Sequence, residues 1–436
     1  MTKMRFRPML YILLFNILGF GLLFLYDGAN KVSYFYTCGI ICAINIIMYM
    51  LLYHLEYGDL YLFLTSSMLV SIGIIMLTRI DIAKNLISEK MVSSYSSKQV
   101  LWFIIGIFTY FLTIVIFKKI KIWNKLRRIY IPLCFLLVLL TLILGTTING
   151  SKNWIVLGSV SIQPSEIIKI LFCMAIATYF CNMPSFNSKK KDTRKRFLNI
   201  PIDEIYLCVF VYSIMGSLAL FQKEWGSALL LFLIFFVMCF IYKTSNLLKI
   251  INVCMIALAI FVGINFLASH IGVRVNAWKN PWQDAQGSGY QIVQSLIAIT
   301  QGGYFGSGLP NGFPLNVPFC ETDFIFASIC EEMGIFMGFA VILLYFIFTY
   351  RGVKITVRIE NEYLKALCLS LVIQMAFQTF IIIGGVVKLL PLTGITLPFV
   401  SYGGSSMLSS FILLGIITAI SLEKEKKINH LPDTKN

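Results

Sequence analysis

Charged residues are scarce in this 436-residue chain and make up only 13% of it. Hydrophobic residues account for 58%, and the mean hydropathy is +0.82. A soluble domain is nearer half apolar and a quarter charged, so the composition excludes a soluble fold and indicates an integral membrane protein. Apolar runs of about 20 residues predict transmembrane helices rather than the alternating strands of a β-barrel.

The residues of several enzyme and metal sites are also lacking. The three histidines, His54, His270 and His430, have no ligand spacing. No Ser-His-Asp set, C-x-x-C pair or phosphate-binding Gly-Lys-Ser/Thr motif occurs. The 11 cysteines lie mostly inside apolar segments, so we interpret them as small buried hydrophobes rather than disulfides or metal ligands.

Twelve apolar segments are candidate membrane spans. They cover residues 8–26, 34–53, 60–78, 100–117, 129–145, 165–182, 205–221, 225–242, 250–267, 324–350, 362–385 and 399–421. The first segment has no convincing small-x-small cleavage site, so we expect it to be a retained helix and not a signal peptide. Together the segments predict an all-α polytopic membrane protein with about twelve spans.

The distribution of positive charge sets the expected orientation. Lysine and arginine concentrate in Lys118–Arg128 and Lys189–Arg196. The positive-inside rule places these loops in the cytoplasm, which puts both termini there and the large loop 268–323 outside. The net charge of +16 then reflects topology and contact with anionic membrane lipids, and it does not indicate nucleic acid as a partner.

A polar stretch from His270 to Gly334 interrupts the helical pattern. It is rich in glycine and aromatic residues, and it runs through Thr322-Asp323-Phe324 into the next apolar segment. A loop of this length with little structure is usually functional or disordered, and we interpret this one as the roof of an active site. Within it, Tyr290–Ile299 is amphipathic, as expected of a segment lying in the outer interface.

Three carboxylates lie at or beyond the outer mouth of the tenth span. Asp323 is consistent with a helix N-cap and equally with a general base, since partial burial can raise a carboxylate pKa towards working pH. Glu331 and Glu332 lie about two turns deeper. A lone carboxylate at the bilayer centre costs about 2.5–3.5 kcal/mol, so this adjacent pair needs water or a cation.

A second set of charges follows Pro164. Glu166 and Lys169 have i, i+3 spacing, which fits either an intrahelical ion pair or a polar cavity in which Lys169 meets a phosphate. Trp154 is as consistent with an interfacial anchor as with a substrate contact. Further outer-side cations, most of which we expect to sit in solvent, are Lys152, Lys223, Arg274, Lys279 and Lys388.

These stretches together resemble the shape, elongation, division and sporulation (SEDS) family, the FtsW/RodA/SpoVE proteins. They occur in the family's order between about residues 60 and 421. The matching pieces are Gly150–Gly158, Ile162–Glu166 with Lys169, Gly287–Gln291 with Gln294-Ser295, Gly302-Gly303 with Gly306, Thr322–Ala327 with Glu331–Gly334, and Leu390-Pro391, Gly394 and Leu397–Ser406.

The resemblance implies a ten-helix core over residues 60–421, with 1–59 as a two-helix N-terminal addition and 422–436 as a cytoplasmic tail. It implies that the core polymerises lipid II into glycan strands at the outer face of the bacterial cytoplasmic membrane. The family's essential acid maps onto Asp323. Its other functional positions map onto Glu166, Lys169 and Trp154.

Three departures from the family pattern occur. Lys223-Glu224-Trp225-Gly226 stands where Pro-Asp-Leu-Gly is usual, and Asp284-Ala285 stands where Asp-Pro is usual. Leu392-Thr393-Gly394 replaces the Thr-Lys-Gly that is frequent in division-type members, which weakens an assignment to that branch. None of these changes touches Asp323, Glu166 or Lys169.

The implied reaction joins two lipid-linked disaccharides. Attack of the acceptor 4-hydroxyl on C1 of the α-linked donor inverts that centre in one displacement and expels undecaprenyl pyrophosphate. Asp323 is the predicted general base. Positive charge for the leaving group is expected from Lys169, Lys152, Arg274 or a divalent cation such as Mg²⁺. Trp154, Glu166 and Glu332 complete the expected substrate-binding set.

Two other functions are compatible with the residues. Intramembrane charges could line the headgroup pathway of a lipid II flippase, or the chain could be a non-catalytic scaffold for a transpeptidase. The polar signals cluster on the outer side and the Thr-Asp-Phe motif is intact, which favours the polymerase. The resemblance also implies a class B penicillin-binding protein as partner, because this sequence holds no transpeptidase domain.

Overall fold

The computed structural model describes residues 7–26, 31–56, 58–87, 94–119, 123–148, 150–158, 160–181, 196–197, 200–242, 244–265 and 271–428. Each of the twelve predicted spans falls on a helix, so the prediction of an all-α polytopic membrane protein is confirmed. These helices are α1 (Arg7–Tyr26), α2 (Lys31–His54), α3 (Leu60–Ile87), α4 (Tyr95–Lys119), α5 (Arg127–Leu144), α6 (Pro164–Phe180), α7 (Ile202–Gly216), α8 (Trp225–Ile241), α9 (Asn246–Asn265), α12 (Ile325–Arg358), α13 (Glu362–Val386) and α14 (Gly404–Ile428).

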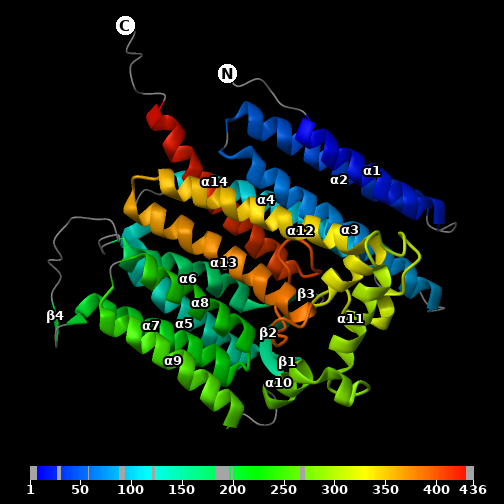
Figure 1. Cartoon of the computed structure of the whole chain (residues 1–436). Coiled ribbons are helices and arrows are strands. Elements are labelled where there is room, and N and C mark those ends of the chain that lie inside the picture. Colours follow the sequence, from blue (N-terminus) through cyan, green and yellow to red (C-terminus); the bar gives the residue numbers. More distant parts are fainter. Residues whose placement is uncertain are drawn as a thin grey trace, which may run out of the picture. The chain divides into compact units, whose positions relative to one another are not determined.

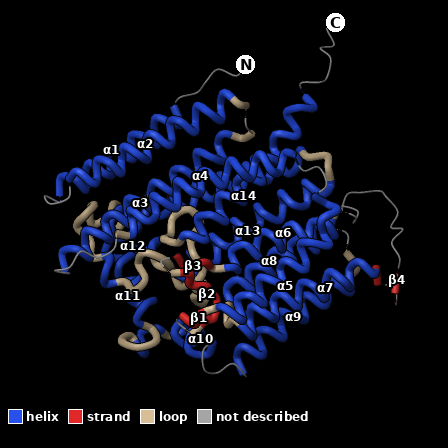
Figure 2. Tube along the Cα trace, turned by 180° about the vertical axis from the view of Figure 1, so that it is seen from behind, coloured by secondary structure: helices blue, strands red, loops and turns tan. Residues whose placement is uncertain are grey.

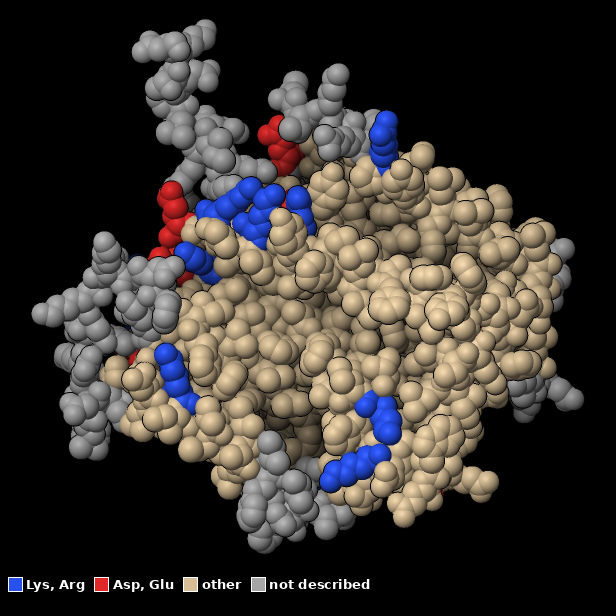
Figure 3. Space-filling model, in the orientation of Figure 1, with Lys and Arg blue, Asp and Glu red and all other residues tan. Residues whose placement is uncertain are grey.

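Eight helices within the described ranges are long and apolar enough to cross a membrane. They are α1 to α4, α7 with its π-helical extension η2 (Ser217–Phe221), α12, α13 and α14. The apolar stretches of α5, α8 and α9 are shorter. Figure 3 shows a surface on which lysine, arginine, aspartate and glutamate are sparse, as contact with lipid requires.

The chain divides into two compact units, a division that the sequence did not indicate. Unit 1 comprises Met1–Ile116, Ala277–Arg351 and Thr379–Asn436, and unit 2 comprises Phe117–Asn276 and Gly352–Gln378. Both units therefore combine segments that are distant in the sequence.

In unit 1 the first two helices form a hairpin that packs on α3 (Figures 1 and 2). Polar side chains join the hairpin to α3 in an otherwise apolar contact. Asn16 Nδ2 donates to Ser71 Oγ at 3.0 Å, and Ser67 Oγ donates to Asn45 Oδ1. All four residues are buried, so these two hydrogen bonds lie inside the contact between the hairpin and α3.

The segment after residue 270 is more regular than we expected. The expectation of a long loop with little structure is wrong, because the segment forms four short helices. They are α10 (Ile271–Lys279), η3 (Pro281–Asp284), α11 (Tyr290–Gly302) and η4 (Pro314–Asn316). Prolines open η3 and η4 and Gly289 precedes α11, so residues that suggested a loop instead mark helix ends. The amphipathic stretch is confirmed as helical, with Ile292 and Val293 buried.

Unit 2 contains α5 to α9 and two small sheets (Figure 1). A three-stranded antiparallel sheet joins β1 (Thr146–Ile148), β2 (Ser151–Leu157) and β3 (Val160–Ile162), with Thr147 opposite Lys152 and Ile155 opposite Ile162. A second pair consists of β4 (Arg196–Phe197) and β5 (Ile200–Pro201). The larger sheet leads directly into α6.

Candidate functional site

Asp323 lies in a tight turn that precedes α12 in unit 1. Phe319 adopts a left-handed conformation with φ of 56°, and its carbonyl accepts hydrogen bonds from the Thr322 and Phe324 amides at 3.0 and 3.2 Å. Because α12 begins at Ile325, Phe324 immediately precedes the helix and Asp323 stands in the turn. Asp323 itself is half-buried.

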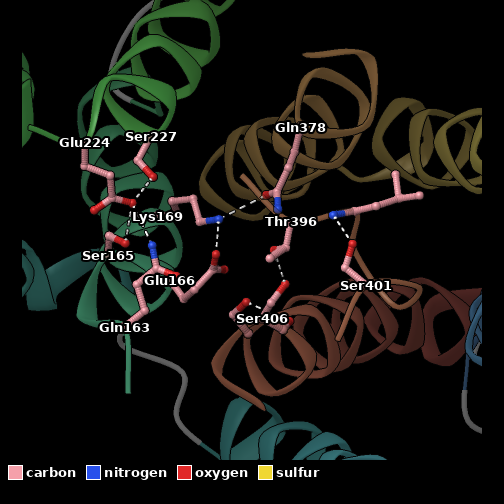
Figure 4. Close-up of polar contacts among 12 residues, drawn as sticks. Gln163, Ser165, Glu166, Lys169, Glu224, Ser227, Gln378, Thr396, Ser401 and Ser406 are labelled. Carbon is pink, nitrogen blue, oxygen red and sulfur yellow. Dashed lines mark hydrogen bonds and ion pairs between the residues drawn. The ribbon is translucent and has the colours of Figure 1, made fainter. Parts of the chain in front are cut away.

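The loop between α13 and α14 holds this turn in place. Ser401 Oγ donates to the Thr322 carbonyl at 2.7 Å, and the Tyr402 amide donates to the Glu321 carbonyl at 2.9 Å. Ser401 also accepts from the Leu397 amide (Figure 4). Gly394 of the same loop has φ of 71°, and a β-carbon placed there would lie 3.8 Å from Asp323 Oδ2. The structure thus brings two sequence motifs, Thr-Asp-Phe and Leu-Thr-Gly, to one place.

A lysine that sequence reasoning missed lies beside the turn. Lys84 Nζ is 3.5 Å from Glu321 Oε1, and it donates to the Tyr95 hydroxyl at 3.1 Å. The ammonium also lies over the Tyr95 ring, 4.3 Å from its centroid. The sequence could have indicated Lys84 because it follows closely after the predicted span 60–78. This cation belongs to the same unit as Asp323.

Glu331 and Glu332 face a loop rather than open solvent. Glu331 Oε1 accepts from the Phe313 amide at 2.8 Å, and Arg79 Nε lies 2.8 Å from Glu332 Oε1. Arg79 Nη2 also donates to the Gly312 carbonyl at 2.7 Å. Both glutamates and the arginine are buried. Arg79 is therefore the cation that pairs with Glu332, while the Phe313 amide binds Glu331.

In unit 2, Glu166 and Lys169 form the ion pair that their spacing predicted. Lys169 Nζ lies 2.8 Å from Glu166 Oε1 and donates to Gln378 Oε1 at 3.1 Å (Figure 4). Both residues are buried on the first turns of α6, with Lys169 only 1% exposed. These bonds use two of the three ammonium donors.

The three other predicted substrate contacts also belong to unit 2. Lys152 Nζ donates to the Leu142 carbonyl at 2.6 Å, so this ammonium caps the carboxyl end of α5. Trp154 is half-buried in β2, and its carbonyl accepts from Thr146 Oγ1 at 3.1 Å. Arg274 is exposed on α10. Among the predicted substrate-binding cations, Lys169 forms an ion pair with another predicted site residue, Glu166.

The described residues also contain no group of three or more His, Cys, Asp or Glu side chains arranged to hold a metal ion.

Comparison with known proteins gives matches over most of the chain. The family model FtsW/RodA/SpoVE, described as a cell cycle protein, matches residues 59–426. The peptidoglycan glycosyltransferase RodA of Mycobacterium tuberculosis is 34% identical over 389 residues, covering 87% of this chain and 81% of the relative. Stage V sporulation protein E of Bacillus subtilis is 32% identical, covering 83% and 96%.

Two solved structures share the fold. The rod shape determining protein RodA of Thermus thermophilus has a TM-score of 0.60 at 21% identity, covering 84% of this chain and 97% of that one. A chain of a peptidoglycan synthase complex that coordinates polymerization and crosslinking has a TM-score of 0.62 at 22% identity, covering 84% and 98%.

Proposed function

The chain belongs to the FtsW/RodA/SpoVE family of cell cycle proteins, and we propose that it is a peptidoglycan glycosyltransferase that polymerises lipid II. The observation that carries this proposal is the set of glycosyltransferase relatives that match most of the chain at 31–34% identity. Asp323, the one acid of the Thr-Asp-Phe motif, is present and half-buried in a braced turn.

Asp323 acts as the general base in this proposal. An inverting transfer needs a base for the acceptor hydroxyl, and no covalent enzyme intermediate is required. The hydrogen bonds from Ser401 and Tyr402 to the backbone on the amino-terminal side of Asp323 fix the turn. Such bracing supports catalysis because a base held in position does not have to be ordered in each turnover.

Lys169 supplies positive charge for the departing pyrophosphate in this proposal. Its ammonium is held by one carboxylate and one neutral amide, which leaves one donor for a phosphate oxygen. We assign Lys152 a structural role, since its ammonium joins β2 to the end of α5. Glu332 likewise has a structural role, because its ion pair with Arg79 joins α12 to α3.

We place the reaction at the outer face of the membrane, with both termini in the cytoplasm, on the basis of the charge distribution. A class B penicillin-binding protein is the proposed partner. The fold shared with a chain of a peptidoglycan synthase complex supports a partner of this kind.

The proposal is tested by measuring glycan polymer made from lipid II by the purified chain with its transpeptidase. D323N keeps the side-chain shape and removes the base, so its rate should fall at least about a hundredfold, the usual contribution of acid–base catalysis. D284N is the matched control, because Asp284 is an exposed aspartate of the same segment whose carboxylate accepts from the nearby Ser288 amide and hydroxyl.

Two results would contradict the proposal. Normal polymerisation by D323N would remove Asp323 from the chemistry. If no variant and no wild-type protein made polymer while labelled lipid II still crossed liposome membranes, the chain would be a flippase.

A further inference from the structure

A buried carboxylate of unit 2 that the reaction does not use collects three hydrogen bonds on a single oxygen. Glu224 Oε1 accepts from Gln163 Nε2 at 2.9 Å, from Ser165 Oγ at 2.8 Å and from Ser227 Oγ at 2.5 Å (Figure 4). Glu224 is 7% exposed. Within the part of the chain that the structure describes, its other oxygen has no hydrogen-bond donor. The side chain therefore serves mainly as one acceptor atom.

Two of the three donors lie at the start of α6. Gln163 precedes the helix and does not cap it with its own side chain, and Ser165 lies in the first turn. Both side chains reach across to Glu224, which stands immediately before α8. These bonds fix where α6 begins and how it is rotated about its axis. A helix turns about 100° per residue, so this rotation also decides where Glu166 and Lys169 point.

Glu224 is itself held by an unusual turn. Lys223 has φ of 55°, and the Glu224 amide donates to the Leu218 carbonyl at 2.9 Å. The Lys223 carbonyl accepts from Ser151 Oγ at 3.2 Å, which ties the turn to β2. A proline at 223 could not adopt this conformation, because its ring fixes φ near −65°. The lysine and the longer acid thus occur together, at the positions where the resembled family has Pro-Asp.

We propose that Glu224 is a positioning residue for the active site, acting through Gln163 and Ser165 on the rotation of α6 and so on the ammonium of Lys169. This inference rests on the role of Lys169 in the proposed function. In this role Glu224 must place an acceptor oxygen as far from the backbone as a glutamate side chain extends, and it need not gain or lose a proton. Lys169 and Glu166 are close enough to attract and repel the Glu224 carboxylate electrostatically, so the three groups form one cluster.

Two substitutions separate reach from charge. E224Q keeps an acceptor oxygen at the same distance from the backbone and removes the charge. E224D keeps the charge and withdraws the oxygen by one methylene, about 1.5 Å. For a positioning role, E224Q should keep kcat within about threefold of wild type. E224D should lower kcat by about tenfold or more with little change in KM, because small misplacements near the reacting atoms are costly.

The matched control is E204D. Glu204 is also a buried glutamate of unit 2, and it accepts from the Ser245 amide and hydroxyl at the start of α9 rather than α6. Both E204D and E224D should lower the melting temperature, because each withdraws a buried acceptor oxygen from its donors. E204D should nevertheless leave kcat close to wild type. A fall in kcat equal to that of E224D would show that E224D acts through general loosening, and would overturn the inference.

A second measurement does not depend on the substrate. Deuterium uptake over residues 163–170 should rise in E224D and stay near wild type in E224Q and E204D. Equal uptake in E224D and E224Q would overturn the inference, as would an E224Q enzyme no more active than E224D. If the wild-type chain makes no polymer, the proposed function fails, and the uptake comparison alone decides whether Glu224 positions α6.

Discussion

At the scale of single residues, the two adjacent carboxylates of α12 have different partners, and one of them is a buried guanidinium. Arg79 pairs with Glu332, and Glu331 is bound by a backbone amide. Removing one partner of a buried ion pair leaves an uncompensated charge, which is far more destabilising than removing both partners. Arg79 also binds the Gly312 carbonyl, so the pair links α3, α12 and the loop between α11 and α12.

We therefore expect R79M to lower the free energy of unfolding by about 3 kcal/mol, and E332M by a similar amount. The double variant R79M/E332M should recover most of that loss, since neither charge remains. Denaturation of the purified wild type and the three variants in detergent measures these differences in the free energy of unfolding. Losses that simply add in the double variant would show that the two side chains are not coupled.

The sequence identified the need for this contact but not its partner. Two adjacent acids in an apolar run require a cation, and that follows from residue type alone. Arg79 lies in a different helix, and nothing in its local spacing joins it to Glu332. Glu166 and Lys169 were predictable as a pair because both lie on one helix, whereas their neighbour Gln378 was not.

At the scale of elements, α12 is broken at one residue. Gly334 has φ of 84° and ψ of 168°, which no helix contains. The loop after α11 replaces the lost bonds. The Ser307 and Gly308 amides donate to the carbonyls of Glu331 and Glu332 at 2.9 and 3.1 Å, and the Ile335 amide donates to the Gly303 carbonyl at 2.9 Å. The break and the loop therefore stabilise each other.

Replacing Gly334 by alanine should be strongly destabilising. A β-carbon there would collide with the backbone of Tyr304 and Gly306, and this conformation is nearly exclusive to glycine. We expect G334A to lower the free energy of unfolding by at least about 2 kcal/mol. G39A in α2, where a β-carbon meets nothing within 4 Å, is the control and should be near neutral. Equal melting temperatures for the two variants would contradict this account.

Elements were predictable to different degrees for physical reasons. A long apolar run can satisfy its backbone hydrogen bonds in a bilayer by forming a helix, so each of the twelve predicted segments falls on a helix. The sheet over residues 146–162 and the short helices over 271–316 depend on turns and on contacts with distant segments. The break in α12 was hidden because Gly334 stands in an apolar run, with partners in a different segment.

At the scale of the whole molecule, the number of crossings decides the side of each terminus. α6 has 17 residues and spans about 25 Å, less than a typical hydrocarbon core of about 30 Å. If α6 crosses with the other eleven predicted spans, both termini lie on the same side. If it does not cross, they lie on opposite sides.

We expect both termini in the cytoplasm, as the charge distribution indicates. Green fluorescent protein fused to either terminus should then fluoresce, and alkaline phosphatase fused to either terminus should be inactive. An active phosphatase at one terminus only would show an odd number of crossings. The same fusions placed after Lys279 should give the reverse result, because that position is assigned to the outside.

The contact between the first hairpin and α3 also has an evolutionary consequence. The family match begins at residue 59, so α1 and α2 lie outside it, yet α3 turns Ser67 and Ser71 towards them. Without the hairpin these serines would face lipid, and without the serines Asn16 and Asn45 would lose partners inside the membrane. A change that removes the hairpin would therefore select for the loss of Ser67 and Ser71 from α3, and a change that removes these serines would be unfavourable while the hairpin is kept.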